Sequence, residues 1–378
     1  MIAQVNSSLY RLNNMNSIQD KLTYQMSGDG LKLEYGSDDS MLFGRLSHIN
    51  DKVLTQTEIK DQLEKTKALN SSADSALAEA KENVFEFVKS ELIKANTDTT
   101  SEEGLIAIAQ NIEGVKQNLL DLANTQVEGQ YLFSGSDSSV KAFTMDANGK
   151  VTYNGNDSLR KIAVDEGSYR ESGVNGFQAF FYTTDSALKG ETLTFEADSK
   201  ILDQEGNEWT LDTVANTLSK KNWDGSFDTL AVTPPTAPAT EYSVTVPNTD
   251  GTRFEAKKNV FDLLDEAINS LRGVDSVGNP LTAEDKKTKI SAAQDGIDKV
   301  IDNIAVAHAD LGARNKTFNN SLDIVESKIS QYNKTSTEIG SSNLTEVGIK
   351  LKSLELMFSA LYSTISQTNQ LSLVNYMK

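Results

Sequence analysis

The segment 343–377 carries apolar residues at alternating gaps of three and four. The members of this stripe are Leu344, Val347, Leu351, Leu354, Phe358, Leu361 and Ile365. Such heptad spacing puts one apolar row along a helix, and the row needs a partner surface to cover it. Asn343 and Glu346 have the spacing of a capping box, which predicts the helix start. Because the neighbouring sequence offers no local core, the stripe must pack against a distant segment.

The segment 1–27 carries a matching stripe. Its members are Ile2, Val5, Leu9, Leu12, Met15, Ile18, Leu22 and Met26. A single terminal helix is only marginally stable in water unless it docks. The charged residues of this segment are Arg11, Asp20 and Lys21, so its burial between protein surfaces has a low electrostatic cost. We predict that the two ends pair with each other and with further copies of the chain, and that both stripes form the assembly interface.

Three long helices are predicted between the two ends. The three-four pattern covers residues 41–96, 102–131 and 282–332, and a polar link at 335–342 precedes the last helix. A pattern sustained over such lengths indicates coiled-coil-like antiparallel helices rather than a bundle of short ones. The helix that begins at Thr282 would extend roughly 75 Å at 1.5 Å per residue.

Two capping signals place the starts of the first two long helices. Ser37 is predicted to cap the first, with Asp38 and Asp39 in its first turn, where the helix dipole favours acidic side chains. Thr100 and Glu103 have the spacing of a capping box for the second. As paired carboxylates, Asp38 and Asp39 could also be catalytic, but the capping role explains both without a substrate.

Residues 140–257 are rich in Gly, Asp and Thr and contain short alternating runs. The runs 143–145 and 151–153 flank a turn and predict a hairpin. Further strands are predicted at 192–195, 209–211, 242–246 and 252–254, the last two on either side of Asp250 and Gly251.

The predicted fold is therefore mainly α with an inserted β-rich domain, in which a long antiparallel coiled-coil-like helical rod carries a β knob. The predicted domains are terminal assembly helices at 1–45 and 334–378, the helical rod at 46–139 and 258–333, and the outer β-rich insertion at 140–257.

Composition narrows the classes of partner. The chain has 378 residues and a formal net charge of −18, which disfavours a nucleic acid or an anionic membrane as a partner. No apolar run approaches the roughly 20 residues of a membrane-spanning helix. No cleaved secretory signal is visible. The chain contains no Cys, so disulfides and thiolate chemistry are excluded.

Residues that could carry chemistry are few and scattered. The two histidines, His48 and His308, lack the spacing of a zinc site. Asp146 and Asn148 suggest calcium, but Gly149 comes too early for an EF-hand loop. No phosphate-binding, dinucleotide-binding or nucleophile-elbow motif is present. We predict no metal, no cofactor and no enzymatic activity.

Two features of the β-rich insertion leave other functions open. Its abundant acidic residues permit a glycosidase-like carboxylate pair. Its aromatic residues could line a sugar-binding site or form the core of a small β domain; they include Phe180, Phe181, Tyr182, Trp209 and Trp223.

Several motifs resemble the flagellin family. Residues 37–39, Ser-Asp-Asp, are similar to the motif after the family's first helix, although Ser40 stands where Pro is usual. Residues 129–136, Gly-Gln-Tyr-Leu-Phe-Ser-Gly-Ser, and 151–156, Val-Thr-Tyr-Asn-Gly-Asn, are similar to the hook-associated branch of the family. Residues 311–316 are similar to the family's Leu/Val-Gly-Ala-Arg-x-Asn segment, with Lys as the basic residue that follows Asn. The likeness covers both helical arms, whereas the part of the insertion from 176 to 247 resembles no known segment.

The resemblance implies a structural, self-assembling subunit that joins hook to filament in the bacterial flagellum. It implies export through the flagellar type III pathway without a cleaved signal, and an extracellular location. The partners that it implies are identical subunits in a ring, a FlgK-like hook-associated protein, flagellin, and a FlgN-like export chaperone on the C-terminal helix.

Three alternatives stay open from the sequence. A filament flagellin is the alternative within the same family. A secreted adhesin would use the β knob to bind a glycan and the terminal stripes as a stalk. A hydrolase would carry an acid pair in the β-rich insertion.

Overall fold

A computed structural model describes residues 2–27, 30–33, 35–97, 100–236, 241–249 and 252–376, and for residues 2–5 and 368–376 it describes the backbone alone. The chain divides into two compact units. The terminal unit comprises Met1–Asp61 with Leu322–Lys378, and the central unit comprises Gln62–Ser321. The terminal unit thus joins the two ends of the sequence.

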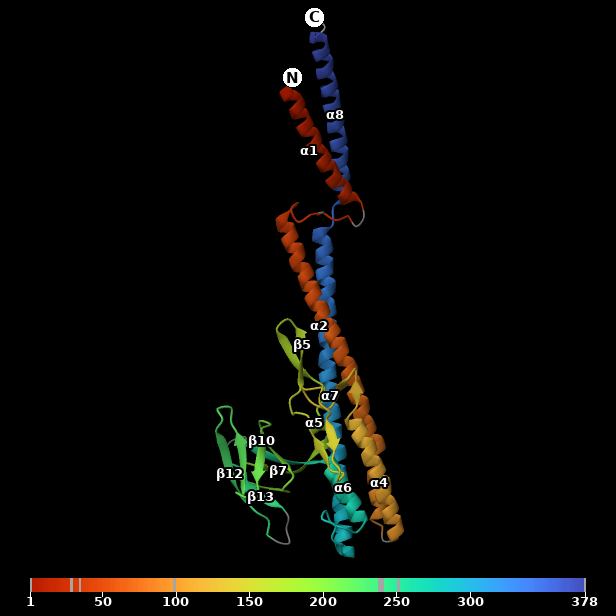
Figure 1. Cartoon of the computed structure of the whole chain (residues 1–378), viewed down its shortest axis with the longest axis vertical. Coiled ribbons are helices and arrows are strands. Elements are labelled where there is room, and N and C mark those ends of the chain that lie inside the picture. The colour runs from red at the N-terminus through yellow and green to blue at the C-terminus, as the bar shows by residue number, and fades with distance from the viewer. Residues whose placement is uncertain are drawn as a thin grey trace. The chain divides into compact units, whose positions relative to one another are not determined.

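Long helices form the framework of each unit (Figure 1). The helical elements are α1 (Ile2–Met26), α2 (Ser40–Glu79), the π-helix η1 (Ala80–Phe85), α3 (Glu86–Ala95), α4 (Glu102–Ala123), α5 (Gly176–Phe180), α6 (Val260–Leu271), α7 (Ala283–Gly340) and α8 (Leu344–Tyr376). Among the described residues, six helix starts carry a side-chain cap at the residue before the helix: Asp39 for α2, Ser101 for α4, Asn175 for α5, Asn259 for α6, Thr282 for α7 and Asn343 for α8.

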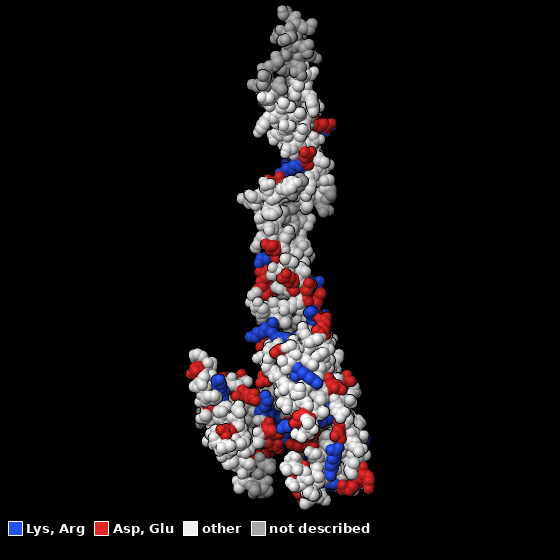
Figure 2. All heavy atoms as spheres, viewed as in Figure 1, with Lys and Arg blue, Asp and Glu red and all other residues white. Residues whose placement is uncertain are grey.

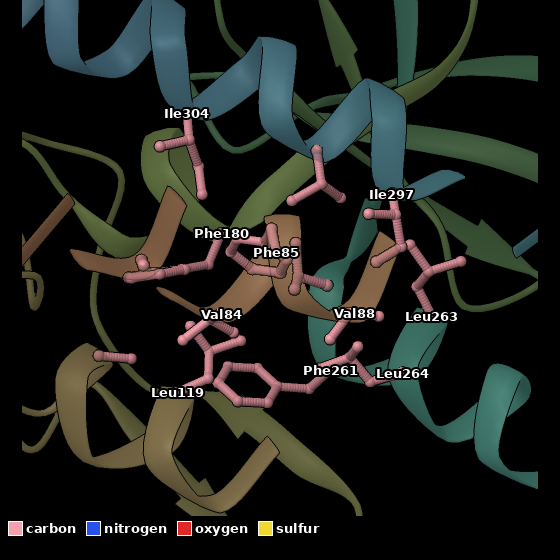
Figure 3. Packing of buried hydrophobic residues seen from close by; sticks show 14 of the residues in the cluster. Val84, Phe85, Val88, Leu119, Phe180, Phe261, Leu263, Leu264, Ile297 and Ile304 are labelled. Carbon is pink, nitrogen blue, oxygen red and sulfur yellow. The ribbon is translucent and has the colours of Figure 1, made fainter. Parts of the chain in front are cut away.

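The apolar rows of η1, α3, α4, α6 and α7 meet in the core of the central unit (Figure 3). Phe85 and Phe261 are fully buried there. Within this unit α7 runs antiparallel to α2 and α3, since Asp298 pairs with Lys89 at 2.6 Å and His308 with Asp74 at 2.8 Å. The buried side-chain amide of Asn70 donates to Asn315 Oδ1 at 2.7 Å, so one polar contact fixes the register of the pair.

The strands form three hairpins and one larger antiparallel sheet. The hairpins are β1 (Gln126–Val127) with β2 (Gln130–Tyr131), β3 (Phe143–Met145) with β4 (Val151–Tyr153), and β5 (Arg160–Asp165) with β6 (Ser168–Ser172). The sheet consists of β7 (Phe181–Leu188), β8 (Thr192–Phe195), β9 (Lys200–Asp203), β10 (Glu208–Asp212), β11 (Thr217–Lys221), β12 (Phe227–Thr233), β13 (Tyr242–Thr245) and β14 (Arg253–Asn259). Its order is β7-β14-β9-β10-β11-β12-β13-β8.

The predicted β-rich insertion contributes to two cores. Phe143 of β3 and Phe180 of α5 are buried in the helical core, where their rings lie 5.5 Å apart. The sheet has its own core, which includes Leu193, Ile201 and Phe254. The first third of the insertion therefore packs with the helices, and the later strands pack with one another.

The predicted strands exist, and the structure supplies the strand pairing that the sequence left open outside the hairpin of β3 and β4. The hairpin of β3 and β4 is confirmed at the predicted residues. The runs on either side of Asp250 and Gly251 do not pair with each other: β13 lies between β12 and β8, and β14 lies between β7 and β9. Asp250 and Gly251 themselves lie outside the described residues. Turn residues in the sequence predict where a strand ends. Which strands pair depends on strands that lie far apart in the sequence.

Two predicted helix limits are wrong. The helix predicted to end at Tyr131 ends at Ala123, because Asn124 exchanges hydrogen bonds with the backbone of Phe143 and the tight turn at Glu128 and Gly129 has positive φ. The predicted polar link 335–342 is helical as far as Gly340, and the hydroxyls of Thr335 and Thr337 donate to carbonyls one turn earlier.

Two predicted caps lie at neighbouring residues, and one helix contains an unpredicted turn. Asp39, not Ser37, caps α2 by accepting from Leu42 N at 3.0 Å. Ser101, not Thr100, caps α4, because the Thr100 hydroxyl donates to Lys94 O. The long helix predicted from 41 to 96 contains η1, a wider turn that the apolar spacing does not reveal.

The predicted fold class, mainly helical with an inserted β-rich domain, is confirmed. Among the described residues no helix is both long and apolar enough to cross a membrane.

Candidate assembly surface of the terminal helices

Helices α1 and α8 lie side by side in the terminal unit and run in opposite directions (Figure 1). Their contact centres on Leu22 of α1 and on Val347 and Leu354 of α8, which are 7%, 5% and 4% exposed. Half-buried side chains extend this cluster along both helices: Met15, Leu351 and Phe358. Two three-four rows of apolar side chains therefore meet along one side of each helix.

The predicted stripes are covered unequally along their length. The covered members are Leu22, Val347 and Leu354, and the half-buried members are Leu12, Met15, Leu351, Phe358, Leu361 and Ile365. The exposed members are Leu9, Ile18, Met26 and Leu344, with Leu9 at 51% and Leu344 at 55%. The side chains of Ile2 and Val5 lie outside the described residues. Among the described side chains, the helix pair thus covers some members of each stripe and leaves others exposed to water.

A second set of exposed apolar residues lies on α8. Ile349 and Leu356 follow the buried Val347 and Leu354 by two positions, so they point to the opposite side of the helix. Met357 and Tyr362 are also more than half exposed on this helix. This row was not predicted, although the seven-residue gap between Ile349 and Leu356 is a sequence signal for it. Helix α8 therefore has apolar side chains on two sides. Helix α1 covers the side of Val347 and Leu354, and the side of Ile349 and Leu356 is exposed.

Charge is scarce on the same surface. Residues 2–19 contain Arg11 as their one charged residue, and residues 356–376 contain none. The charges of α8 gather in its first turns, where Lys350 pairs with Glu346 at 2.7 Å and Lys352 with Glu355 at 2.6 Å. The hydrogen bond and the positive charge of Lys350 lower the pKa of Glu346. Figure 2 shows little charge on the described part of α1 and α8 that faces the viewer.

Backbone hydrogen bonds tie the segment after α1 to the junction between α7 and α8. Lys32 N donates to Gly340 O at 2.7 Å, and Ser342 N donates to Gly30 O at 2.6 Å. The Lys32 ammonium donates to Ile339 O at 3.0 Å. These bonds hold together the points where α1 ends and α8 begins, so the two stripes enter the pair in a fixed register.

The candidate chemical residues do not form a site. His48 is exposed, and His308 makes a surface contact with Asp74. Asp146 Oδ1 accepts from the backbone N–H groups of Asn148 and Lys150, which makes it a turn residue of the hairpin. In the described part of the chain no group of three His, Asp or Glu side chains could hold a metal ion.

The aromatic residues proposed for a sugar site have separate environments. Phe180, Phe181 and Tyr182 are buried in the helical core, and Trp209 is buried in the sheet core. Trp223 is 99% exposed. The interpretation of these aromatic residues as core residues is therefore correct for all of them except Trp223.

The carboxylate nearest to Trp209 is held in its ionised form. Asp203 accepts a hydrogen bond from the indole N–H at 3.1 Å and bonds from Asn207, and it lies 3.5 Å from Lys220. Burial acts to raise the pKa of Asp203, but the hydrogen bonds from Asn207 and Trp209 and the charge of Lys220 outweigh burial and lower it. A carboxyl that stays ionised cannot serve as the general acid of a glycosidase pair.

Long helices, an inserted antiparallel sheet and an incompletely covered pair of terminal helices define a flagellin-like class of fold. No known protein family matches the sequence by its profile, and no curated protein matches it by sequence. Solved structures nevertheless share the fold. FlgL from Xanthomonas campestris is 17% identical over 76% of this chain and 99% of its own, with a TM-score of 0.53.

A second solved structure supports the same assignment of the fold. A Vibrio parahaemolyticus protein, assigned as flagellar hook-associated, is 14% identical over 80% of this chain and 100% of its own, with a TM-score of 0.54. The fold is therefore that of FlgL-type flagellar hook-associated proteins. The prediction of a non-enzymatic protein agrees with these neighbours, which are structural proteins.

Proposed function

We propose that this chain is a self-assembling structural subunit of the bacterial flagellum, located at the junction between hook and filament. Its fold is shared with two flagellar proteins, one of them a FlgL and the other assigned as hook-associated. Its terminal helices expose apolar rows that a single copy does not cover.

The incomplete terminal pair carries the proposal. Each row of apolar surface left in water has a free-energy cost of about 25 cal/mol per Å² relative to burial. Large exposed apolar patches mark interaction sites in soluble proteins. Because Leu9, Leu344, Ile349 and Leu356 are exposed beside a covered seam, identical subunits in a ring can bury them against one another.

The finer assignments rest on the sequence motifs. Residues 129–136 are similar to the hook-associated branch and favour the junction over the filament, so filament flagellin is the second candidate. The same resemblance supports export by the flagellar type III pathway and an extracellular location. It also supports binding of α8 by a FlgN-like chaperone, and contacts with a FlgK-like protein and with flagellin.

The test changes one covered seam residue and one exposed neighbour on α8. Leu354→Asp places a charge in the α1–α8 contact, whereas Ser353→Asp adds the same charge at an exposed position. In the bacterium that carries this chain, each variant replaces the native copy. We expect Leu354→Asp to lower incorporation into purified hook–filament structures at least tenfold, and Ser353→Asp to leave it near normal.

Circular dichroism and thermal unfolding of the purified variants check that the central unit is intact in both. Normal incorporation of Leu354→Asp would refute the role of the terminal seam. Localisation of the tagged chain along the whole filament would favour the flagellin alternative.

A further inference from the structure

A groove of about 680 Å³ lies between the β5–β6 hairpin and α7 in the central unit. It is lined by Lys161, Tyr169, Arg170, Glu171, Arg314, Thr317 and Phe318. Phe318 is 2% exposed, and Tyr169 is 58% exposed. The groove thus combines aromatic surface with hydrogen-bonding groups on two elements distant in sequence.

The charge of the groove contrasts with that of the chain. The chain has 54 acidic and 36 basic residues, yet three cations and one carboxylate line the groove. Among the described residues, Lys161, Arg170 and Arg314 make no ion pair. Elsewhere in the central unit, Arg272 pairs with Glu113 at 2.7 Å and Lys89 with Asp298 at 2.6 Å.

Backbone carbonyls, rather than carboxylates, orient the two arginines of the groove. Arg314 Nη1 donates to Gly173 O at 2.7 Å, and Arg170 Nη1 donates to Tyr169 O at 2.9 Å. A guanidinium has five N–H donors in a rigid fork, so each arginine retains donors for a further acceptor. Carboxylates match this fork, and pairing of both oxygens adds geometric specificity.

We propose that this groove binds an acidic segment of a second copy of the chain, an inference that rests on the proposed self-assembly. The matching segment is formed by the first turns of α4 and α7, which Lys286 joins by donating to Glu102 at 2.7 Å. Glu103 and Glu284 are exposed there, and among the described residues neither makes an ion pair.

One copy cannot make this contact with itself. Glu284 and Arg314 lie on the same helix, and their separation of 30 positions corresponds to about 45 Å at 1.5 Å per residue. The groove of one copy therefore meets the acidic turns of another. Such a heterologous contact closes into a ring or continues as a filament, depending on the rotation between copies.

The absence of native cysteine allows a direct test by disulfide cross-linking of the full chain. Thr317→Cys places a thiol in the groove, and Ala283→Cys places one beside Glu284 without removing an acid. We expect an equal mixture of these two variants to form a mixed disulfide dimer after oxidation at low salt. Ser75→Cys, an exposed position on α2, replaces Ala283→Cys in the control mixture, which should yield at least tenfold less product.

Charge reversal separates the groove from general association. Lys161→Glu with Arg170→Glu alters two exposed residues of the groove, and Lys316→Glu makes the matched change at an exposed position outside its lining. We expect the double reversal to lower the yield of mixed dimer at least tenfold, and Glu103→Lys with Glu284→Lys on the other copy to restore it. Lys316→Glu should leave the yield within twofold.

The outcomes distinguish this inference from the proposed function. Normal assembly through the terminal seam together with equal cross-linking in the test and control mixtures would overturn the groove contact and leave the function standing. Equal yields with and without charge reversal would also overturn it. Failure of the chain to self-associate at all would overturn both.

Discussion

The α1–α8 pair and the helical core of the central unit are built from the same three-four spacing but differ in how much of it is covered. In the central unit, Ile297, Val300, Ile304 and Leu311 of α7 are all fully buried. In the terminal pair, three side chains are buried and their neighbours in the row are half-buried or exposed.

The difference follows from the number of elements that surround each helix. In the central unit, side chains from η1, α3, α4, α5 and α6 pack around α7, so its main apolar row meets a partner along its length, whereas single apolar residues such as Val306 stay exposed (Figure 3). In the terminal pair α8 has α1 as its partner in the described cluster. The heptad pattern therefore predicts which side of a helix is apolar, and the number of neighbouring elements decides whether that side is covered.

The largest expected effect contrasts one phenylalanine from each region. Phe261→Ala should lower the free energy of unfolding by about 3–5 kcal/mol, because it empties a fully buried site. Phe358→Ala should lower it by less than about 1 kcal/mol, because that ring is half-buried and the pair contributes little to the main core. Urea denaturation followed by circular dichroism measures both. Equal losses would contradict the comparison.

The same contrast explains which parts of the fold the sequence predicts. Periodicity locates the helices, and the turn between β3 and β4 predicts the hairpin that these two strands form. The early end of α4 was not predicted, because the hydrogen bonds of Asn124 to Phe143 join residues from two elements. The position of β14 between β7 and β9 also depends on pairing that local sequence does not specify.

The candidate site was predicted in part. The stripes identify Leu22, Val347 and Leu354, which do meet in the structure. The unpredicted row of Ile349 and Leu356 has its own seven-residue spacing, but it becomes apparent as a surface only when the covered side of α8 is known. The role of both rows as an assembly interface stays a prediction. The groove at Arg314 needs the tertiary fold, because its basic residues come from a hairpin and a distant helix.

A second experiment sharpens the comparison by testing close packing on α7. A Cβ added at Gly296 would lie 2.7 Å from Leu263 Cδ1, whereas one added at Gly312 would meet nothing within 4 Å. Gly296→Ala should therefore lower the free energy of unfolding by about 1–3 kcal/mol through overpacking. Gly312→Ala should raise it by about 0.5–1 kcal/mol through helix propensity. Thermal unfolding compares the two variants. If Gly296→Ala were stabilising, the packing of Gly296 against Leu263 would have to be less tight than the 2.7 Å approach indicates.

The smallest effect concerns a carboxylate in each region. Burial, followed by the nearby charge of Asp198, raises the pKa of Asp262 to about 6, whereas Lys350 lowers that of the exposed Glu346. Folded Asp262 therefore keeps a proton that the unfolded chain releases above a pKa of about 3.9. Its contribution to stability is present below that pKa and is lost as the pH rises through 6.

Asn cannot ionise, so Asp262→Asn removes the loss of stability that the chain undergoes when Asp262 becomes charged. The substitution should raise the free energy of unfolding at pH 7 by on the order of 1–2 kcal/mol and change it little at pH 4. Asp295→Asn removes the same charge from an exposed position on α7 and should have no such pH dependence. Urea denaturation at both pH values measures the difference. An equal effect of Asp262→Asn at pH 4 and pH 7 would place the cause in packing rather than in the buried charge, and the central unit would then owe its pH dependence to other groups.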